Sequence, residues 1–281
     1  MRREERVATY IETITIAQQK YYSTRKGDVV MLPSVVGEST FYEDRFTPKD
    51  TERFDNEEII VENEDSLILA KKLIDKGLHP AVLNMANRFM PGGGVIKGSG
   101  AQEENIFRRT NLFQSLYRYH DIGKDFNVEQ EKKHYPMNDN YGGIYSKDVV
   151  VFRWSEDKEY DVLEKPFFVD VISVAAINGP QYDSNFNLSD RDAKKEKNKI
   201  RTIFNIALQQ GNDSLVLGAF GCGAFKTPPK AMAKLFHEVL DEEFYKNKFK
   251  LVAFAILNTN CNFQRHNPEG NFKPFKDEFS N

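Results

Sequence analysis

Glycine is unevenly placed in this 281-residue sequence, and its placement limits the folds that the chain can adopt. Eight of the 17 glycines fall in two short loops. The first loop holds Gly92, Gly93, Gly94, Gly98 and Gly100, and the second holds Gly218, Gly221 and Gly223. Each loop follows an apolar run and precedes a stretch with helical spacing. This order is typical of layered α/β folds, in which loops lead from buried strands into helices.

The apolar runs are continuous and do not alternate with polar residues, which is the pattern of strands covered by helices on both faces. We predict buried strands at residues 80–86, 149–152, 167–176, 214–217 and 251–257, and short edge strands within 27–64. We predict helices at residues 6–22, 66–76, 102–119, 194–210 and 228–240. Gly77 follows the second helix as a C′ residue, and Thr227 and Pro228 are predicted as the N-cap and first residue of the last. The polar stretch 124–148 is predicted to be a long loop.

The composition sets further limits. Hydrophobic residues make up 40% of the chain and the net charge is −3, so no overall basic field would hold nucleic acid. The two cysteines, Cys222 and Cys261, are too few for a disulfide framework or a structural zinc site. We find no apolar run typical of a signal peptide or a membrane span, and expect a cytoplasmic protein without membrane contacts.

The two glycine-rich loops are a candidate ligand site. Glycine allows a ligand to approach the main chain closely, and N–H groups at a loop that enters a helix bind anions. Two such loops at one edge of a sheet would hold a diphosphate between them, although either loop alone is equally consistent with a tight turn. Neither loop matches a Walker or Rossmann motif, which disfavours a nucleoside triphosphatase or a dehydrogenase.

A pair of acids, Glu103 and Glu104, follows the first loop directly after Gln102. Acids are common in a first helical turn because they complement the helix dipole. Beside a bound anion, however, an acid is repelled and its position needs another reason. Adjacent helical residues point about 100° apart, so only one of the two is expected to face a reacting bond, first as acid and then as base.

These residues carry a resemblance to a known family. Gly92-Gly93-Gly94 followed by Gln102-Glu103-Glu104 resembles the GGG-x(6–8)-QEE signature of poly(ADP-ribose) glycohydrolases of the microbial type. The segment 83–87 resembles the Asn-x-x-Asn element of macrodomains, and 217–225 resembles the second phosphate loop of the family. The resemblance implies a three-layer α/β/α macrodomain-like fold with a mixed sheet and an N-terminal helical extension. We expect a single catalytic domain over 1–281, with the extension at 1–78 and the macrodomain core at 79–265.

The resemblance also implies roles for individual residues. Glu104 would be the catalytic acid and base, and Glu103 would hold ribose hydroxyls. The implied ADP-ribose-binding residues are Asn87, Gly92, Gly93, Gly94, Gln102, Gly221, Cys222, Gly223, Ala224, Phe225 and Phe263. The implied reaction is hydrolysis of the ribose–ribose O-glycosidic bond and needs no cofactor or metal, in agreement with five histidines that lack ligand spacing.

The expected partners are ADP-ribose polymer or ADP-ribosylated proteins. Two alternatives stay open from the sequence. One is a hydrolase that removes a single ADP-ribose from a modified protein. The other is a macrodomain that binds ADP-ribose without cleaving it, although a binding module would not need the carboxylate of Glu104. The sequence does not indicate an oligomeric state.

Overall fold

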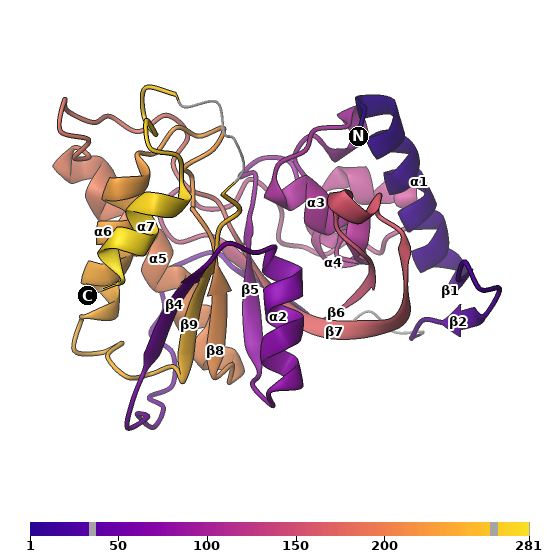
Figure 1. Ribbon diagram of the computed structural model, residues 1–281, viewed down its shortest axis with the longest axis horizontal. Helices are drawn as coiled ribbons and strands as arrows, with labels where there is room; N and C mark the ends of the chain where they lie inside the picture. Colours follow the sequence, from indigo (N-terminus) through magenta and orange to yellow (C-terminus); the bar gives the residue numbers. More distant parts are fainter. Residues whose placement is uncertain (34–37, 259–263, 281) are drawn as a thin grey trace.

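The computed structural model describes residues 1–33, 38–258 and 264–280, and a seven-stranded mixed sheet lies at its centre (Figure 1). The strands run in the order β3-β6-β7-β5-β8-β9-β4. Their bounds are β3 Ser39–Tyr42, β4 Glu58–Glu62, β5 Pro80–Met85, β6 Gly143–Arg153, β7 Val162–Val174, β8 Ser214–Leu217 and β9 Leu251–Ala255. The five strands from β7 to β4 are parallel, whereas β6 and β3 pair antiparallel. The predicted mixed sheet is confirmed.

Helices cover both faces of this sheet (Figure 1). Helices α1 Arg3–Gln19, α2 Ser66–Asp75, α3 Gln102–Arg109 and α4 Phe113–Leu116 lie on one side, and α5 Asp190–Gln210, α6 Pro229–Leu240 and α7 Phe272–Glu278 lie on the other. The short 3₁₀ helices are η1 Val95–Lys97, η2 Tyr117–Tyr119, η3 Asp121–Phe126 and η4 Glu156–Lys158. The three-layer α/β/α prediction is therefore confirmed.

The central strand β5 shows why the apolar runs are continuous. Val82 packs with the core on the α2 side, whereas its neighbours Ala81 and Leu83 pack with the core on the α5 side. All three are essentially inaccessible to solvent. Because side chains alternate between faces along a strand, a strand buried on both faces is apolar at most positions, and its one polar side chain, Asn84, donates to Ser173.

Several helix boundaries follow from local capping. Asp65 caps α2, since its Oδ1 accepts hydrogen bonds from the N–H groups of Leu67 and Ile68 at 3.0 Å each. Gly77 follows this helix with a φ of +82°, as predicted. Ser189 caps α5, which begins four residues before the predicted start at 194.

Other predictions were wrong in detail. The helix predicted over 102–119 breaks after Arg109, where Thr110 leaves the helix and forms a β-bridge with Val151 of β6. Residues 143–148, predicted as loop, belong to β6 because they pair with the long strand β7. Thr227 does not cap α6: Pro228 is the N-cap, and the hydroxyl of Thr227 is buried.

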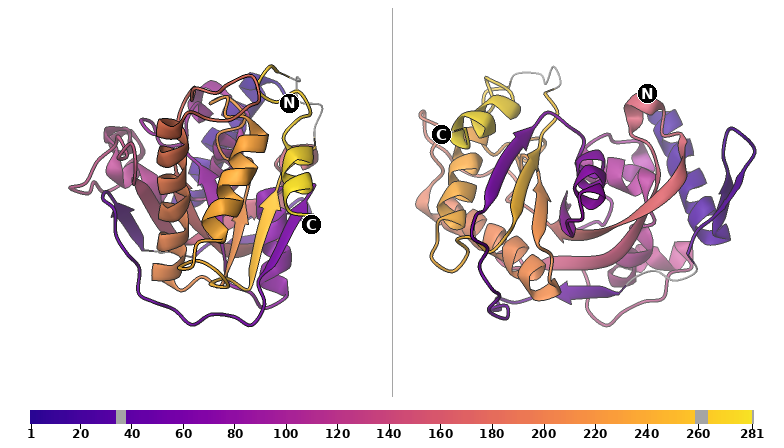
Figure 2. Two further views of the ribbon diagram at one scale, coloured as in Figure 1. Left: turned by 90° about the vertical axis from the view of Figure 1, so that its left-hand side faces the viewer. Right: turned by 60° about the horizontal axis from the view of Figure 1, so that its bottom comes forward.

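The N-terminal part of the chain joins the sheet at both edges. Helix α1 begins at Arg3 and leads into a small antiparallel hairpin, β1 Tyr21–Ser23 with β2 Val29–Met31 (Figure 2). Strands β3 and β4, which both precede residue 78, form the two edges of the main sheet. The division at residue 78 remains a prediction.

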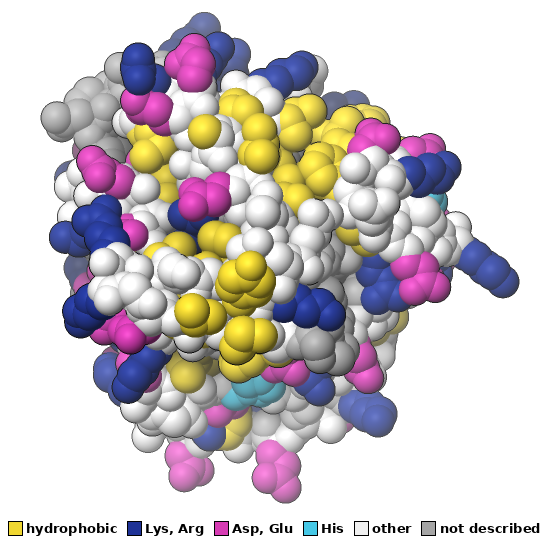
Figure 3. Space-filling model, turned by 90° about the vertical axis from the view of Figure 1, so that its right-hand side faces the viewer, with side chains coloured by type: hydrophobic (Ala, Val, Ile, Leu, Met, Phe, Trp, Pro, Cys, Tyr) yellow, Lys and Arg dark blue, Asp and Glu magenta, His cyan; other side chains and the backbone are white. Residues whose placement is uncertain are grey.

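Figure 3 looks onto the side of the molecule that carries α1 and the hairpin, where hydrophobic side chains gather at the surface. Ile11, Val29 and Met31 are exposed large hydrophobic residues of these elements. Within the three described segments, no helix combines the length and the apolar character needed to cross a membrane.

Candidate active site

The two glycine-rich loops meet at the edge of the sheet that is formed by the carboxyl ends of the parallel strands. Strands β5 and β8 are parallel neighbours, with Ala81 paired to Leu215, so the loops that follow their carboxyl ends are adjacent. A cavity of about 190 Å³ lies between them. This edge is where ligands bind in open α/β sheets.

Most of the predicted site residues line this cavity. From the first loop and α3 these are Asn87, Gly93, Gly94, Gln102, Glu103 and Glu104, and from the second loop Gly221, Gly223, Ala224 and Phe225. The sequence analysis missed five further lining residues: Met85, Ala101, Ala176, Ala219 and Phe220. Met85 and Ala176 follow the rule that strand ends face the site, and this signal was available in the sequence.

Three predicted residues are not among the lining residues. Gly92 is buried, and a Cβ there would lie 2.6 Å from the ring of Phe107. Cys222 is buried in the core on the α5 side, and burial raises the pKa of its thiol well above the usual value. Phe263 lies outside the described residues.

Glu103 holds the first loop together. Its Oε2 accepts a hydrogen bond from the N–H of Asn87 at 2.8 Å, and its Oε1 accepts one from the N–H of Gly92 at 3.0 Å. The side chain is buried, and desolvation raises its pKa to about 8, although the two backbone N–H groups act in the opposite direction. The charge of Glu104 raises this pKa further.

Glu104 sits beside Glu103 but has a different environment. Its Oε1 accepts a hydrogen bond from the N–H of Gly94 at 2.9 Å. Its Oε2 is buried and has no hydrogen-bond partner among the residues that the structure describes. A Cβ on Gly93 would lie 2.7 Å from Oε1, so only glycine at 93 leaves room for this carboxylate.

Gln102 and Asn87 both fix the backbone around the cavity. Gln102 donates to the carbonyl of Leu83 at 2.6 Å and accepts from the N–H of Met85 at 2.9 Å, which ties the start of α3 to the end of β5. The Oδ1 of Asn87 accepts from the N–H groups of Phe89 and Met90. No bond from its Nδ2 is found in the described part of the chain, so this group is available to a ligand.

The two loops differ in their free N–H groups. In the first loop, the N–H groups of Gly92 and Gly94 donate to the glutamates, and that of Gly93 donates to the carbonyl of Met90. In the second loop, the N–H groups of Gly221, Gly223, Ala224 and Phe225 have no partner within residues 1–33, 38–258 and 264–280. Four free donors around one bend form an anion-binding concavity. His266 stabilises this loop through a 2.9 Å hydrogen bond between its Nε2 and the carbonyl oxygen of Cys222.

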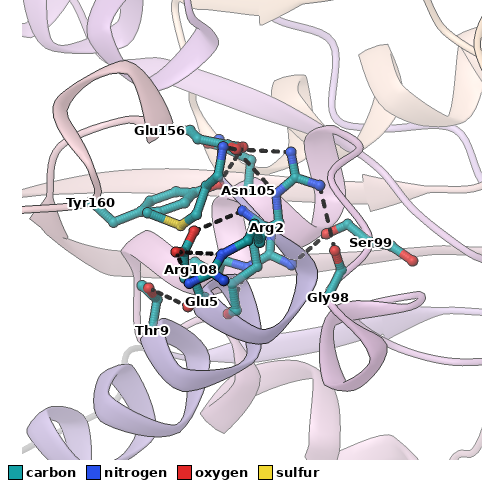
Figure 4. A network of polar contacts seen from close by, with 11 residues as sticks. Arg2, Glu5, Thr9, Gly98, Ser99, Asn105, Arg108, Glu156 and Tyr160 are labelled. Carbon is teal, nitrogen blue, oxygen red and sulfur yellow. Dashed lines mark hydrogen bonds and ion pairs between the residues drawn. The ribbon is translucent and has the colours of Figure 1, made fainter.

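Helix α1 fixes the first loop from outside (Figure 4). The guanidinium of the fully buried Arg108 donates to the carbonyl of Arg6 at 3.1 Å and to the carbonyl of Ser99. Arg6 in turn forms an ion pair with Glu156 at 2.8 Å. A Cβ on Gly98 would lie 2.4 Å from the carbonyl oxygen of Arg3, so the loop and the helix are in direct contact. The N-terminal helix therefore positions the loop that carries the glutamates.

The described residues contain no cluster of His, Cys, Asp or Glu suited to a metal ion. One cavity therefore holds both the carboxylate of Glu104, whose Oε2 has no hydrogen-bond partner among the described residues, and the free N–H donors of the second loop. A three-layer α/β/α fold with its cavity at the carboxyl ends of the parallel strands places this protein in the class of macrodomain-like proteins.

Comparison with known proteins identifies the family within this class. The family model for the microbial-type PARG catalytic domain matches residues 11–154, which is about half of the chain. The chain belongs to this family and is a glycohydrolase. A comparison with curated proteins gave no match.

Solved structures agree with this assignment. The chain is similar to the poly(ADP-ribose) glycohydrolase of Thermomonospora curvata, with 25% identity, a TM-score of 0.76, and coverage of 98% of this chain and 100% of that one. The same enzyme bound to the inhibitor ADP-HPD matches at 26% identity, with a TM-score of 0.74 and the same coverage. The Deinococcus radiodurans enzyme in complex with ADP-ribose matches at 26% identity, with a TM-score of 0.64, over 86% of this chain and 94% of that one.

Proposed function

We propose that this protein hydrolyses the ribose–ribose O-glycosidic bonds of poly(ADP-ribose) and releases ADP-ribose, with Glu104 as general acid and base. One observation carries the proposal. The carboxylate of Glu104, with one oxygen unpartnered among the described residues, lines the same cavity as the free N–H groups of the second loop. A catalytic carboxylate and a diphosphate cradle are thus joined in one cavity.

In this proposal the second loop binds the diphosphate. The N–H groups of Gly221, Gly223 and Ala224 donate to its oxygens, and Phe225 packs over the nucleotide. The Nδ2 of Asn87 donates to a hydroxyl of the distal ribose. Glu103 keeps the first loop in shape and contacts ribose hydroxyls from its buried position. We also assign five residues to the ADP-ribose site that would act by setting the backbone conformation of the two loops: Gly92, Gly93, Gly94, Gln102 and Cys222.

The reaction then proceeds in two proton transfers. Protonated Glu104 donates its proton to the leaving ribose oxygen as the C–O bond breaks and positive charge develops on the anomeric carbon. The resulting carboxylate then takes a proton from a water molecule, whose oxygen forms the new bond to that carbon. Glu104 is protonated again at the end of the cycle, and no other co-reactant is consumed.

The relatives support the choice of substrate. Enzymes named poly(ADP-ribose) glycohydrolase match over 98% and 86% of the chain, and structures of these enzymes hold the inhibitor ADP-HPD or ADP-ribose. By analogy we assign ADP-ribose polymer, or ADP-ribosylated proteins, as the partner of this site.

The test compares two substrates and two proteins. ADP-ribose release is measured from poly(ADP-ribose) and from mono-ADP-ribosylated protein, for wild type and for Glu104→Gln. The proposal predicts release from polymer and a loss of about 10²–10⁴-fold in Glu104→Gln, which is the usual contribution of a general acid. Release only from mono-modified protein would replace the substrate and keep Glu104. ADP-ribose binding without any release would make the protein a binding module and refute the proposal.

A further inference from the structure

A second cavity, of about 540 Å³, lies apart from the candidate active site and shares none of its lining residues. It is bounded by the turn between β1 and β2 at residues 24–26, by α2, by the end of β6, and by the first part of β7. Its size is within the range of small-molecule sites. None of the roles assigned above uses it.

Two buried guanidinium groups, those of Arg109 and Arg153, line this cavity. The exposed fractions of their side chains are 2% and 5%. The Nη1 of Arg109 binds both carboxylate oxygens of Asp65 at 2.8 Å, but no partner for its Nη2 is found in the described segments. Arg153 pairs with Glu12 at 2.9 Å, and its Nε is buried without a hydrogen-bond partner among the described residues. The Nη2 of Arg109 is thus a charged donor without a partner among the described residues at the cavity wall, and a phosphate oxygen would satisfy it.

The rim of the cavity is also basic. Arg25, Lys26, Lys71 and Lys165 line it together with only two acids, Asp161 and Glu164. The acids pair with Arg25 at 2.8 Å and with Lys26 at 2.6 Å, but both cations are more than two-thirds exposed. Exposed pairs of this kind contribute little, so a phosphate can replace the carboxylate. Lys71 pairs with Asp75 at 2.6 Å, whereas Lys165 forms no ion pair within the described residues, so Lys165 is the rim cation most readily available to a phosphate.

An aromatic surface completes the cavity. Trp154, the only tryptophan of the chain, is 44% exposed and lines the cavity directly after Arg153. Aromatic side chains beside a cationic groove are the combination that binds single-stranded nucleotides, because bases stack on the ring while the cations bind phosphate.

We propose that this cavity is a second nucleotide site, which binds an ADP-ribosyl unit of the polymer remote from the bond that is cleaved. Its adenine stacks on Trp154, and its diphosphate binds Arg109 and the rim cations, with Arg153 adding positive charge behind them. The choice of ligand rests on the proposed function. Helix α3 connects the two sites, since Arg109 follows Glu104 by five residues, or about 8 Å along the axis. In this proposal a polymer with several ADP-ribosyl units engages both sites at once, whereas a single ADP-ribose occupies one of them.

The fluorescence of Trp154 reports on this site alone because no other tryptophan contributes. We would titrate full-length protein carrying Glu104→Gln with ADP-ribose, with a short ADP-ribose polymer and with inorganic pyrophosphate, at low and high salt. The rim variant Lys165→Glu is compared with Lys147→Glu, which reverses the charge of another exposed lysine that does not line either cavity. Calorimetry of the same samples counts the bound ADP-ribose per chain.

The expected result is a saturable, salt-sensitive change in emission with ADP-ribose and with polymer, and two bound equivalents of ADP-ribose. Lys165→Glu should raise the Kd of this phase about tenfold, because one charge-assisted bond to phosphate is lost, and Lys147→Glu should not. Polymer should bind more tightly than ADP-ribose, because it can occupy both sites.

Three results would overturn the inference. One is an unchanged emission with every ligand while calorimetry finds one bound equivalent. Another is an equal response to pyrophosphate, which would exclude base stacking. The third is an equal effect of both lysine substitutions. Hydrolysis of polymer by wild type is measured separately, so failure of the second site and failure of the proposed function are distinguishable.

Discussion

Replacing Gly93 with alanine should move the carboxylate of Glu104, the proposed acid and base, without unfolding the protein. The new Cβ would lie 2.7 Å from Oε1 of Glu104, whereas ordinary contact begins at 3.4 Å, so the carboxylate must shift by about 0.7 Å. This shift would lengthen and weaken the 2.9 Å hydrogen bond from the N–H of Gly94. Displacement of a catalytic group by about 1 Å can cost about 100-fold, so we expect kcat/KM for polymer to fall by about 10–100-fold.

The control for this variant is Gly211→Ala. Gly211 also has a positive φ, +78° against +53° at Gly93, but its added Cβ meets nothing within 4 Å. It follows α5 and precedes β8, at the sheet edge opposite the site. Alanine in the left-handed region costs roughly 1–2 kcal/mol, so both variants should lose similar stability in urea unfolding. Equal kcat/KM values for the two variants would refute the steric role that we assign to Gly93.

Three further predictions follow from the structure. Because burial raises the pKa of Glu103 to about 8, the folded protein retains a proton that the unfolded chain releases near 4.5, and stability is lost as the pH rises between these values. The stability advantage of wild type over Glu103→Gln should therefore shrink by up to about 1.4 kcal/mol per pH unit across pH 5.5–8, and a constant difference in urea unfolding would contradict the raised pKa. Gly223→Ala adds a methyl group to a cavity-lining residue, and this group meets no atom within 4 Å. The free energy of unfolding should therefore change by less than about 0.5 kcal/mol. Calorimetry in the Glu104→Gln background should show weaker ADP-ribose binding. Asp65→Asn keeps a capping side chain for α2 but leaves the buried Arg109 without its carboxylate. The free energy of unfolding should therefore fall by about 3 kcal/mol. A fall of less than about 1 kcal/mol would show that the ion pair is dispensable.

The sequence predicted the sheet well because burial on both faces leaves a clear pattern. The apolar runs at β5, β8 and β9 coincide closely with the strands, and the two glycine loops meet because β5 and β8 are parallel neighbours. The carboxyl-edge rule then brings the predicted site residues together without further information. Features that depend on neighbouring residues, or on the direction of a strand, could therefore be predicted.

Features that depend on distant contacts could not be predicted. The helical pattern over 102–119 contains no glycine or proline, yet it breaks where Thr110 forms a bridge to β6. The sequence also did not indicate that α1 contacts the first loop through the backbone at Arg3 and Gly98. In both cases a residue far along the chain decides the local structure, so no spacing rule would reveal it.

The structure also gives a physical reason for acids beside an anion site. In the first loop the N–H groups of Gly92 and Gly94 donate to Glu103 and Glu104, so these donors are already occupied by the acids of the same loop. The free N–H groups belong to the second loop, where the described structure places no acid among the cavity-lining residues. The two loops therefore have separate tasks: one holds carboxylates against backbone donors, and the other offers donors to phosphate. In the proposed reaction this separation would keep Glu104 near the reacting sugar while the diphosphate, whose charge would repel it, binds the opposite loop.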